Sequence, residues 1–222
     1  MTPTAISGYD LLSFVHILLF VYWLGGDLGV FYTANYVARP DLAKPERLRF
    51  LELLMKVDMY PRMALIAMLP VGFHLAATIG AVRLASVELA LLWLAAALWF
   101  ALMWAVHLKA GPAWLKPLDL AVRWAVLATL FALGAAGLIV DWPTDRAWLA
   151  LKFLLFAAVI ALGLTLRRAV VVWVQGFGQL DADPETGNRL IVDGRRRAAK
   201  LALTLWACLI LMAFLGVVKP VI

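Results

Sequence analysis

Residues 147–166 read AWLALKFLLFAAVIALGLTL, and this stretch decides the class of the protein. Lys152 is its one charged side chain, and almost all the other residues are apolar. A run of about 20 apolar residues is long enough to cross the hydrocarbon core of a bilayer as an α-helix. Because a backbone in hydrocarbon must form its hydrogen bonds within its own segment, the stretch predicts a transmembrane helix.

The rest of the chain has the same character. Its 222 residues are 65% hydrophobic and 15% charged, with a mean hydropathy of +0.91, whereas a soluble domain is about half apolar and about a quarter charged. This composition excludes a soluble globular enzyme and a disordered chain, and the unbroken apolar runs exclude a transmembrane β-barrel. We therefore expect one all-α transmembrane domain over residues 1–222, with six membrane-spanning helices near residues 9–37, 60–82, 87–108, 118–140, 147–174 and 198–218.

Cysteine and charge exclude further classes. A single cysteine, Cys208, excludes a disulfide framework and a cysteine-built zinc or iron–sulfur site. The net charge of +6 is explained by loops that face an anionic leaflet, and because no nucleic-acid motif is present we expect no nucleic-acid partner.

The positions of Lys and Arg predict the orientation. The segments that follow the first, third and fifth spans hold 16 of the 20 Lys and Arg residues. The remaining four are Arg83, Arg146, Lys152 and Lys219. Short cytoplasmic loops are enriched in Lys and Arg, so we expect both termini outside, on the periplasmic side of a bacterial inner membrane.

Two segments are expected outside the hydrocarbon core. Residues 40–58 mix charged residues with leucines and predict an amphipathic helix at the membrane interface. Residues 176–197 contain the sequence DPETG at 183–187 and predict a cytoplasmic loop.

Three ionisable residues from three spans are expected at one depth. At about 1.5 Å of rise per residue, His16, His74 and Lys152 lie roughly 10, 12 and 9 Å below the same membrane face. Two imidazoles facing each other between apolar helices suit the iron of haem b, so His16 and His74 are the expected metal ligands. Lys152 would face a haem propionate or an anionic substrate and is a candidate catalytic residue.

The same face of the first span carries further polar and small residues. Trp23 and Asp27 lie within about 20° of His16 around the helix. Trp23, Gly26 and Arg62 are candidate cofactor contacts, and Asp27 is a candidate catalytic residue that either handles protons or pairs with Arg62.

Three segments resemble one superfamily. Residues 16–26 read HILLFVYWLGG, residues 60–72 read YPRMALIAMLPVG, and residues 148–168 begin with Trp and carry a lysine inside an apolar helix. These patterns resemble the small membrane proteins that include the CopD copper-resistance domain and the HemJ-type protoporphyrinogen oxidase. The HemJ resemblance implies that His16 and Lys152 are functional, that haem b binds, and that electrons pass to quinone or another acceptor. The CopD resemblance implies copper uptake.

Three functional hypotheses follow. The first is a haem-b-binding inner-membrane redox protein that is linked to a porphyrin or a quinone. The second is a transport protein for copper or another cation, with Asp27, His16 and the methionines at 55, 59 and 63 along its route. The third is a non-catalytic membrane subunit of a larger complex. A homo-oligomer or a partner subunit is expected, and whether the protein is an enzyme is left open.

Overall fold

The computed structural model describes residues 6–109 and 111–221, and every regular element in this part of the chain is an α-helix. The prediction of an all-α membrane protein with six long apolar helices is confirmed. Helix α2 precedes α3 within one of the six spans. The helices are α1 (Gly8–Val37), α2 (Lys44–Val57), α3 (Met59–Thr78), α4 (Ser86–His107), α5 (Leu115–Ile139), α6 (Ala147–Gln179) and α7 (Pro184–Val218).

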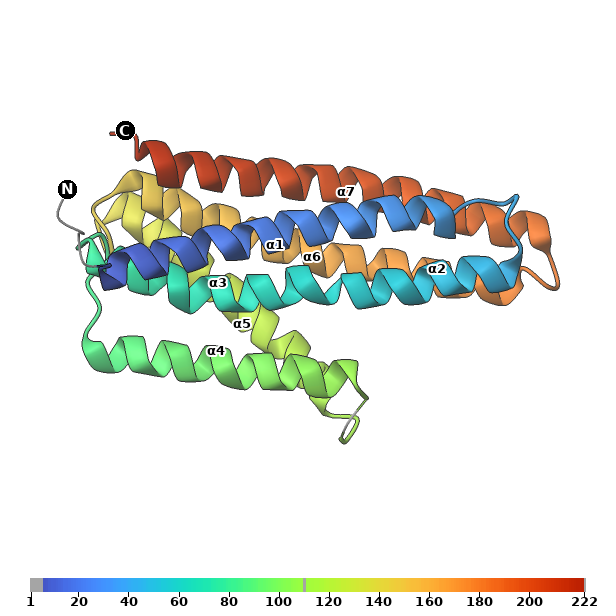
Figure 1. Ribbon diagram of the computed structural model, residues 1–222, viewed down its shortest axis with the longest axis horizontal. Coiled ribbons are helices and arrows are strands. Elements are labelled where there is room, and N and C mark those ends of the chain that lie inside the picture. Colours follow the sequence, from blue (N-terminus) through green and yellow to red (C-terminus); the bar gives the residue numbers. More distant parts are fainter. Residues whose placement is uncertain (1–5, 110, 222) are drawn as a thin grey trace.

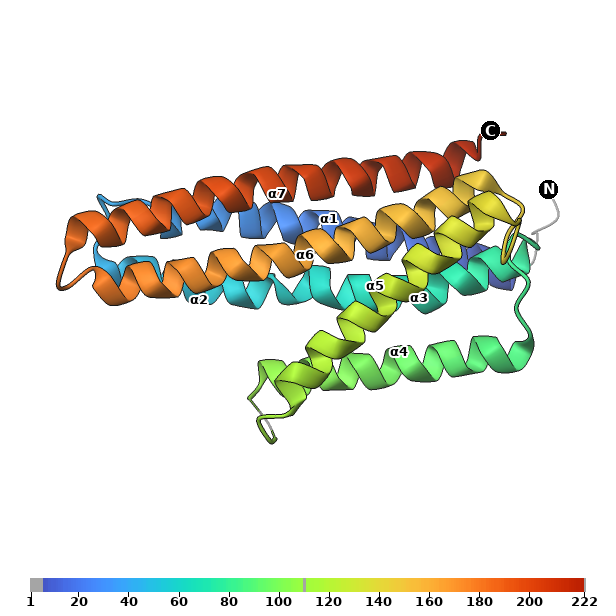
Figure 2. The same ribbon diagram turned by 180° about the vertical axis from the view of Figure 1, so that it is seen from behind.

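The helices form one elongated bundle (Figure 1). Helices α1, α3, α6 and α7 run side by side, and both ends of the chain lie at the same end of the bundle. Helix α4 lies along one flank, and α5 crosses obliquely from α4 to α6 (Figure 2). The bundle therefore has a terminal end, where both ends of the chain lie, and an opposite end. We call the opposite end the arginine-rich end, because most of the Lys and Arg residues lie in or beside the α1–α2, α4–α5 and α6–α7 connections on that side.

Four helices continue past the α4–α5 connection at the arginine-rich end (Figure 1). Helix α2 covers most of residues 40–58, where the sequence predicts an interfacial amphipathic helix, and it runs in line with α3 and extends the bundle. Residues 176–197 are helical apart from the turn at 180–183, so the expected loop is much shorter. The turn ends at Asp183, whose side chain accepts the Thr186 N–H at 3.0 Å and whose pKa is lowered by that bond.

A second apolar core, separate from the main core of the bundle, explains why these segments are helical. It joins side chains of α1, α2, α6 and α7, so the apolar face of each segment packs against its neighbours. Its buried members are Ala34, Val37, Ala38, Leu54, Trp173, Phe177 and Ile191.

A buried arginine fastens this extension together. Arg47 of α2 is 2% exposed. Its Nε donates to the Val37 carbonyl at 2.9 Å, and its Nη1 donates to Asn188 Oδ1 at 2.7 Å. The guanidinium also lies 5.2 Å from the centre of the Phe177 ring. One side chain thus holds the end of α1 and the start of α7 against α2.

Small residues allow α5 and α6 to approach closely. A Cβ on Gly134 would lie 2.8 Å from the Ala150 carbonyl oxygen and 2.7 Å from Leu154 Cγ. Glycine removes this conflict, and close backbone approach strengthens helix association in a membrane. The close α5–α6 contact sets one side of the bundle core.

An acidic residue on α5 gathers three donors from three helices. Asp119 is 2% exposed and accepts hydrogen bonds from Trp99 Nε1 of α4 at 3.2 Å, Arg123 Nε at 3.0 Å and Arg167 Nη2 of α6 at 2.8 Å. A carboxylate at this position is expensive unless it is paired and hydrogen-bonded. The network ties α4, which has few other anchors, to α5 and α6.

Gly134→Ala should destabilise the protein by about 1–3 kcal/mol, because the added methyl group overpacks a contact with backbone. Gly163→Ala on α6 is the matched control, since its Cβ would meet nothing within 4 Å. Thermal unfolding in detergent micelles measures both. Equal midpoints for the two variants would contradict the close α5–α6 contact.

Asp119→Asn should cost about 3 kcal/mol or more, because it leaves two guanidinium groups without their shared counter-charge. Asp41→Asn is the control, because Asp41 forms an exposed pair with Arg39 and its loss should leave the unfolding midpoint unchanged. An Asp119→Asn protein with the wild-type midpoint would show that the network does not hold the helices.

Candidate functional site

A cavity with a volume of about 580 Å³ lies near the terminal end of the bundle, between α1, α3, α6 and α7. Most of its walls are apolar. The lining includes Phe20, Trp23, Leu69, Phe73, Leu149, Phe153, Phe156, Leu209 and Met212.

Aromatic rings form two sides of this cavity. Phe73 of α3 and Phe153 of α6 stack with centres 5.0 Å apart and planes 13° apart. Trp23 of α1 meets Phe156 of α6 edge to face at 5.5 Å. These flat walls suit a flat ligand.

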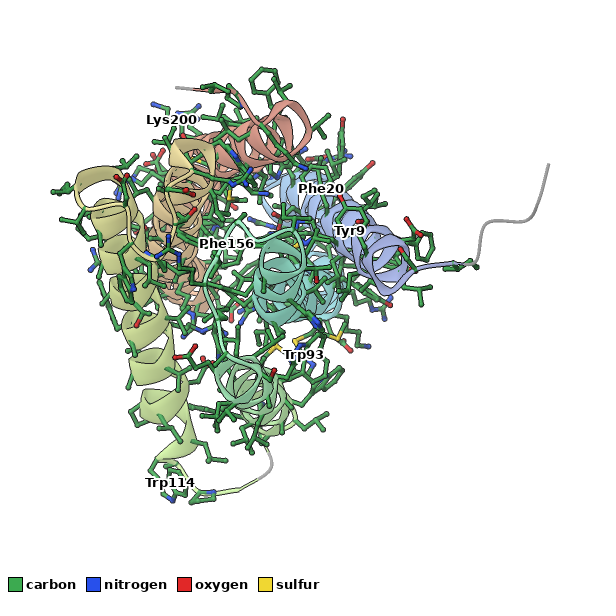
Figure 3. The ribbon with its side chains drawn as sticks, turned by 90° about the vertical axis from the view of Figure 1, so that its left-hand side faces the viewer. Tyr9, Phe20, Trp93, Trp114, Phe156 and Lys200 are labelled. Atoms are coloured by element: carbon green, nitrogen blue, oxygen red, sulfur yellow. The ribbon has the colours of Figure 1, made fainter. Side chains whose placement is uncertain are left out.

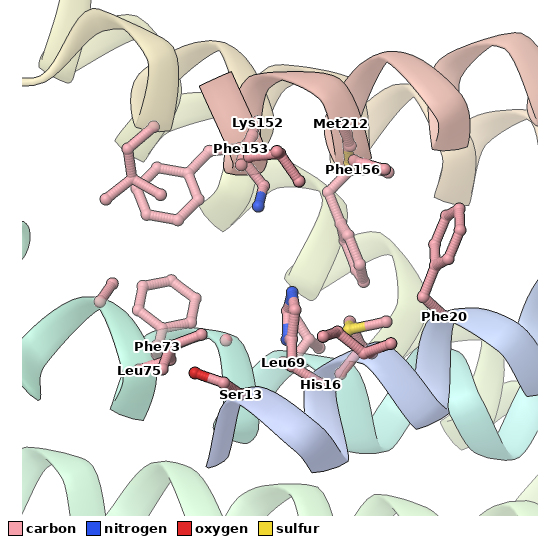
Figure 4. Close-up of a pocket in the computed structure, with 18 of the residues that line it drawn as sticks. Ser13, His16, Phe20, Leu69, Phe73, Leu75, Lys152, Phe153, Phe156 and Met212 are labelled. Atoms are coloured by element: carbon pink, nitrogen blue, oxygen red, sulfur yellow. The ribbon is translucent and has the colours of Figure 1, made fainter. Parts of the chain in front are cut away.

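The polar groups in the cavity are cationic or neutral. His16, Lys152 and Lys219 line it together with Ser13 and Tyr9. Among the residues that the structure describes, no carboxylate lines the cavity. Figure 4 shows His16 on α1 and Lys152 on α6 pointing into the same space from opposite walls. The lining of the cavity therefore suits an apolar ligand that carries negative charge.

Two glycines give these side chains their room. A Cβ on Gly72 of α3 would lie 3.3 Å from His16 Cε1, so the imidazole packs directly on the α3 backbone. A Cβ on Gly216 of α7 would lie 2.8 Å from Lys152 Nζ. The Nδ1 atom of His16 and the hydroxyl of Ser13 are buried without a hydrogen-bond partner in the described part of the chain. Both remain available to a ligand.

The structure does not bring His74 to His16. The His74 ring packs edge to face against Trp93 of α4, with centres 6.3 Å apart, and His74 is not among the cavity-lining residues. Figure 3 looks along the bundle from the terminal end and shows Trp93 between α3 and α4. The reason is helical phase. Gly72 faces His16, and residue 74 lies roughly 160° from residue 72 around the same helix. Equal depth therefore did not mean a shared cavity.

A second cavity, of about 300 Å³, holds two of the other predicted residues. Asp27 and Arg62 both line it, but they do not pair. Arg62 Nε instead donates to Asp58 Oδ2 at 2.7 Å, and Asp27 Oδ2 is buried without a hydrogen-bond partner within the described residues. Trp23 lines both cavities, so this buried indole is the wall between them.

Gly26 lines neither cavity. A Cβ there would lie 2.6 Å from Pro61 Cδ, so this glycine allows α1 to pack against α3. The predicted cofactor contact at Gly26 is thus a helix contact in the structure.

The methionines predicted for a copper route do not share one cavity. Met59 is 5% exposed and belongs to the main apolar core, Met63 packs against that core, and Met55 lines the second cavity. Over residues 6–109 and 111–221, no three His, Cys, Asp or Glu side chains gather as a metal-binding group.

Sequence reasoning missed several residues that line the cavities. Lys219 enters the sequence analysis only as a charge outside the membrane core, whereas in the structure it lines the same cavity as Lys152. Arg123, within the predicted span 118–140, enters it only as a charge that predicts orientation, whereas in the structure it is buried beside Asp119. The i, i+4 spacing of Asp119 and Arg123 at the start of an apolar run was the signal that could have identified this pair.

Comparisons with known proteins found no match to this chain. No protein-family model, no curated protein and no solved structure matches it. The resemblance to the CopD and HemJ proteins therefore stays a prediction.

Lys152→Met should stabilise the protein by about 1–2 kcal/mol, because it removes a cation that has no acidic partner in an apolar cavity. Lys219→Met is the matched control, since Lys219 is exposed and its loss should not change the midpoint. Thermal unfolding in the absence of added ligand provides the measurement. A clear loss of stability in Lys152→Met would mean that the lysine is a structural residue.

Proposed function

We propose that this chain binds haem b in the large cavity, with His16 as the one imidazole available to the iron. The observation that carries the proposal is the combination of His16 and Lys152 in an apolar cavity of about 580 Å³ without any carboxylate among the described lining residues. The volume lies within the range of about 300–1,000 Å³ that is usual for ligand and cofactor sites.

The residues fit a haem better than a bare metal ion. A haem iron needs one or two protein ligands because the macrocycle supplies the other four, and the cavity offers one imidazole. A protein-built copper or zinc site needs three or four donors, and the part of the chain that the structure describes gathers no such set.

Each polar residue has a role in this proposal. His16 would ligate the iron. The absence of a side chain at Gly72 lets the imidazole pack on the α3 backbone while it lines the cavity. Lys152 and Lys219 offer positive charge to the two propionates, and a charge-assisted bond is stronger in a cavity that excludes water. The bound group supplies one-electron iron chemistry, with a potential that depends on the axial ligand and on burial.

The cavity faces the lipid phase as well as the bundle interior. Ile17 and Val217 line it and are 62% and 83% exposed, respectively. In a membrane these surfaces contact lipid, so an apolar partner can reach the cavity sideways through the bilayer. This access favours a quinone or a porphyrin as the partner of the redox chemistry.

Orientation and location follow from charge. The arginine-rich end would lie in the cytoplasm of a bacterium and the large cavity would open in the outer leaflet of its inner membrane. Membership of the CopD and HemJ superfamily fits this arrangement through His16 and Lys152, and assembly with a second copy or a partner subunit is a prediction as well.

The absorbance spectrum of the purified full chain, expressed with a full haem supply, tests the proposal. We expect a Soret band and a reduced α-band in the wild type. His16→Ala should lose both bands, because it removes the ligand. His74→Ala is the matched control and should keep the wild-type haem content, because His74 packs against Trp93. Absence of the bands in the wild type, or their survival in His16→Ala, would overturn the proposal.

Cation transport is the second candidate, and one observation favours it. His16 and Asp27 lie on one face of α1 and line the two cavities that share Trp23 as their wall. Copper at a fixed stoichiometry by elemental analysis, together with a protein that has no chromophore, would favour this candidate over haem binding.

A further inference from the structure

Four arginines from four helices line the second cavity. They are Arg62 of α3, Arg123 of α5, Arg167 of α6 and Arg195 of α7. This cavity lies on the arginine-rich side of Trp23, and the proposed haem site does not use it. Such a concentration of guanidinium groups between membrane helices needs an explanation, because each one is costly to bury.

The carboxylates nearby do not neutralise these arginines. Arg62 is paired with Asp58. Arg123 and Arg167 share the single carboxylate of Asp119, so one positive charge is left over there. Arg195 forms no salt bridge with any described residue. When the carboxylate of Asp27 in the same cavity is counted with Asp58 and Asp119, the four guanidinium groups still exceed the three carboxylates by one.

Arg195 is held by neutral groups alone. Its Nη2 donates to Asn35 Oδ1 at 2.7 Å and to the Phe31 carbonyl at 3.3 Å. The guanidinium lies 4.3 Å from the centre of the Phe31 ring. Its Nε is buried without a hydrogen-bond partner in the described part of the chain. These contacts hold the side chain in place and leave its charge uncompensated.

Arg123 carries the clearest sign of a missing partner. The residue is 8% exposed, and its Nη2 is buried without a hydrogen-bond partner among residues 6–109 and 111–221. A buried charged group that lacks a hydrogen-bond partner is costly, because it has lost its contacts with water and gained nothing in return. An anion in the cavity would accept this bond and would balance the surplus charge.

We infer that the second cavity binds the phosphate group of a membrane glycerophospholipid. The arginines hold the phosphate, since guanidinium groups match phosphate oxygens in geometry. The apolar lining accommodates the start of an acyl chain. It includes Val159, Ile160, Leu166, Val170, Ala202 and Leu205. Arg167 keeps 36% of its side chain exposed, so the cavity is open to the surroundings beside α6.

Asp27 indicates which phospholipid headgroups the proposed site would accept. Its Oδ2 is buried in the same cavity without a hydrogen-bond partner in the described chain. A carboxylate beside a phosphate site accepts a hydrogen bond from the rest of the ligand. A headgroup with an amine or a hydroxyl, such as phosphatidylethanolamine or phosphatidylglycerol, supplies this donor, and phosphatidylcholine does not.

Native mass spectrometry of the full chain in detergent tests the site, with phosphatidylglycerol, phosphatidylethanolamine and phosphatidylcholine added in turn. Arg167→Gln should weaken binding of the first two lipids by about tenfold, because it removes a charge-assisted bond. Arg168→Gln is the matched control, because it makes the same change of charge on an exposed neighbour that does not line the cavity. Equal weakening in both variants would show a general attraction to a basic surface and would overturn the site.

Two further measurements keep the inference open to refutation if Arg167→Gln unfolds. Asp27 Oδ2 has no hydrogen-bond partner within the described residues, so Asp27→Asn should fold. It should reduce the preference for phosphatidylethanolamine over phosphatidylcholine by about threefold or more, since an amide attracts an ammonium group less than a carboxylate does. An unchanged preference would overturn the role of Asp27. Inorganic phosphate at millimolar concentration should not displace the lipid, and displacement would identify free phosphate as the source of the anion.

The outcome does not depend on haem. The wild type should retain the lipid whether or not it shows a Soret band, because Trp23 separates the two cavities. His16→Ala should therefore keep the wild-type lipid affinity, and loss of lipid in that variant would contradict two independent sites.

Discussion

The high free energy of an unpaired charge in hydrocarbon is the constraint on which this structure depends. Asp119 meets it fully, because Trp99, Arg123 and Arg167 all donate to its carboxylate. The same network anchors α4, the helix that stands apart on one flank of the bundle (Figure 1). Polar groups that do not meet this constraint are therefore informative, and five of the eight unpartnered buried side-chain atoms in the described chain belong to residues that line the two cavities.

The two cavities differ in their charges, and the difference determines what each can hold. The larger one combines an imidazole and two ammonium groups with flat aromatic walls. The smaller one combines four guanidinium groups with Asp27 and Asp58. Trp23 lies between them, and helix α1 contributes side chains to both. One helix thus contributes to both of the cavities for which ligands are proposed.

Sequence reasoning succeeded where one segment carries all the information. The six spans follow from the length of each apolar run, because every backbone hydrogen bond of a membrane helix lies within that helix. It also placed His16 and Lys152 at one level, and in the structure both point into one cavity (Figure 4). It did less well at residues 176–197, since the helices there are stabilised by a core that four distant segments build together.

The sequence by itself determined the class of the protein and the number of spans, because these depend on the local apolar pattern. Only the tertiary structure decided which polar side chains meet. His74 has a suitable depth, but its direction around α3 turns it towards α4. Arg123 lies within the predicted span 118–140, and the packing of α5 against α4 and α6 buries it beside Asp119. Direction depends on which neighbours each helix packs against, and a single sequence does not contain that choice.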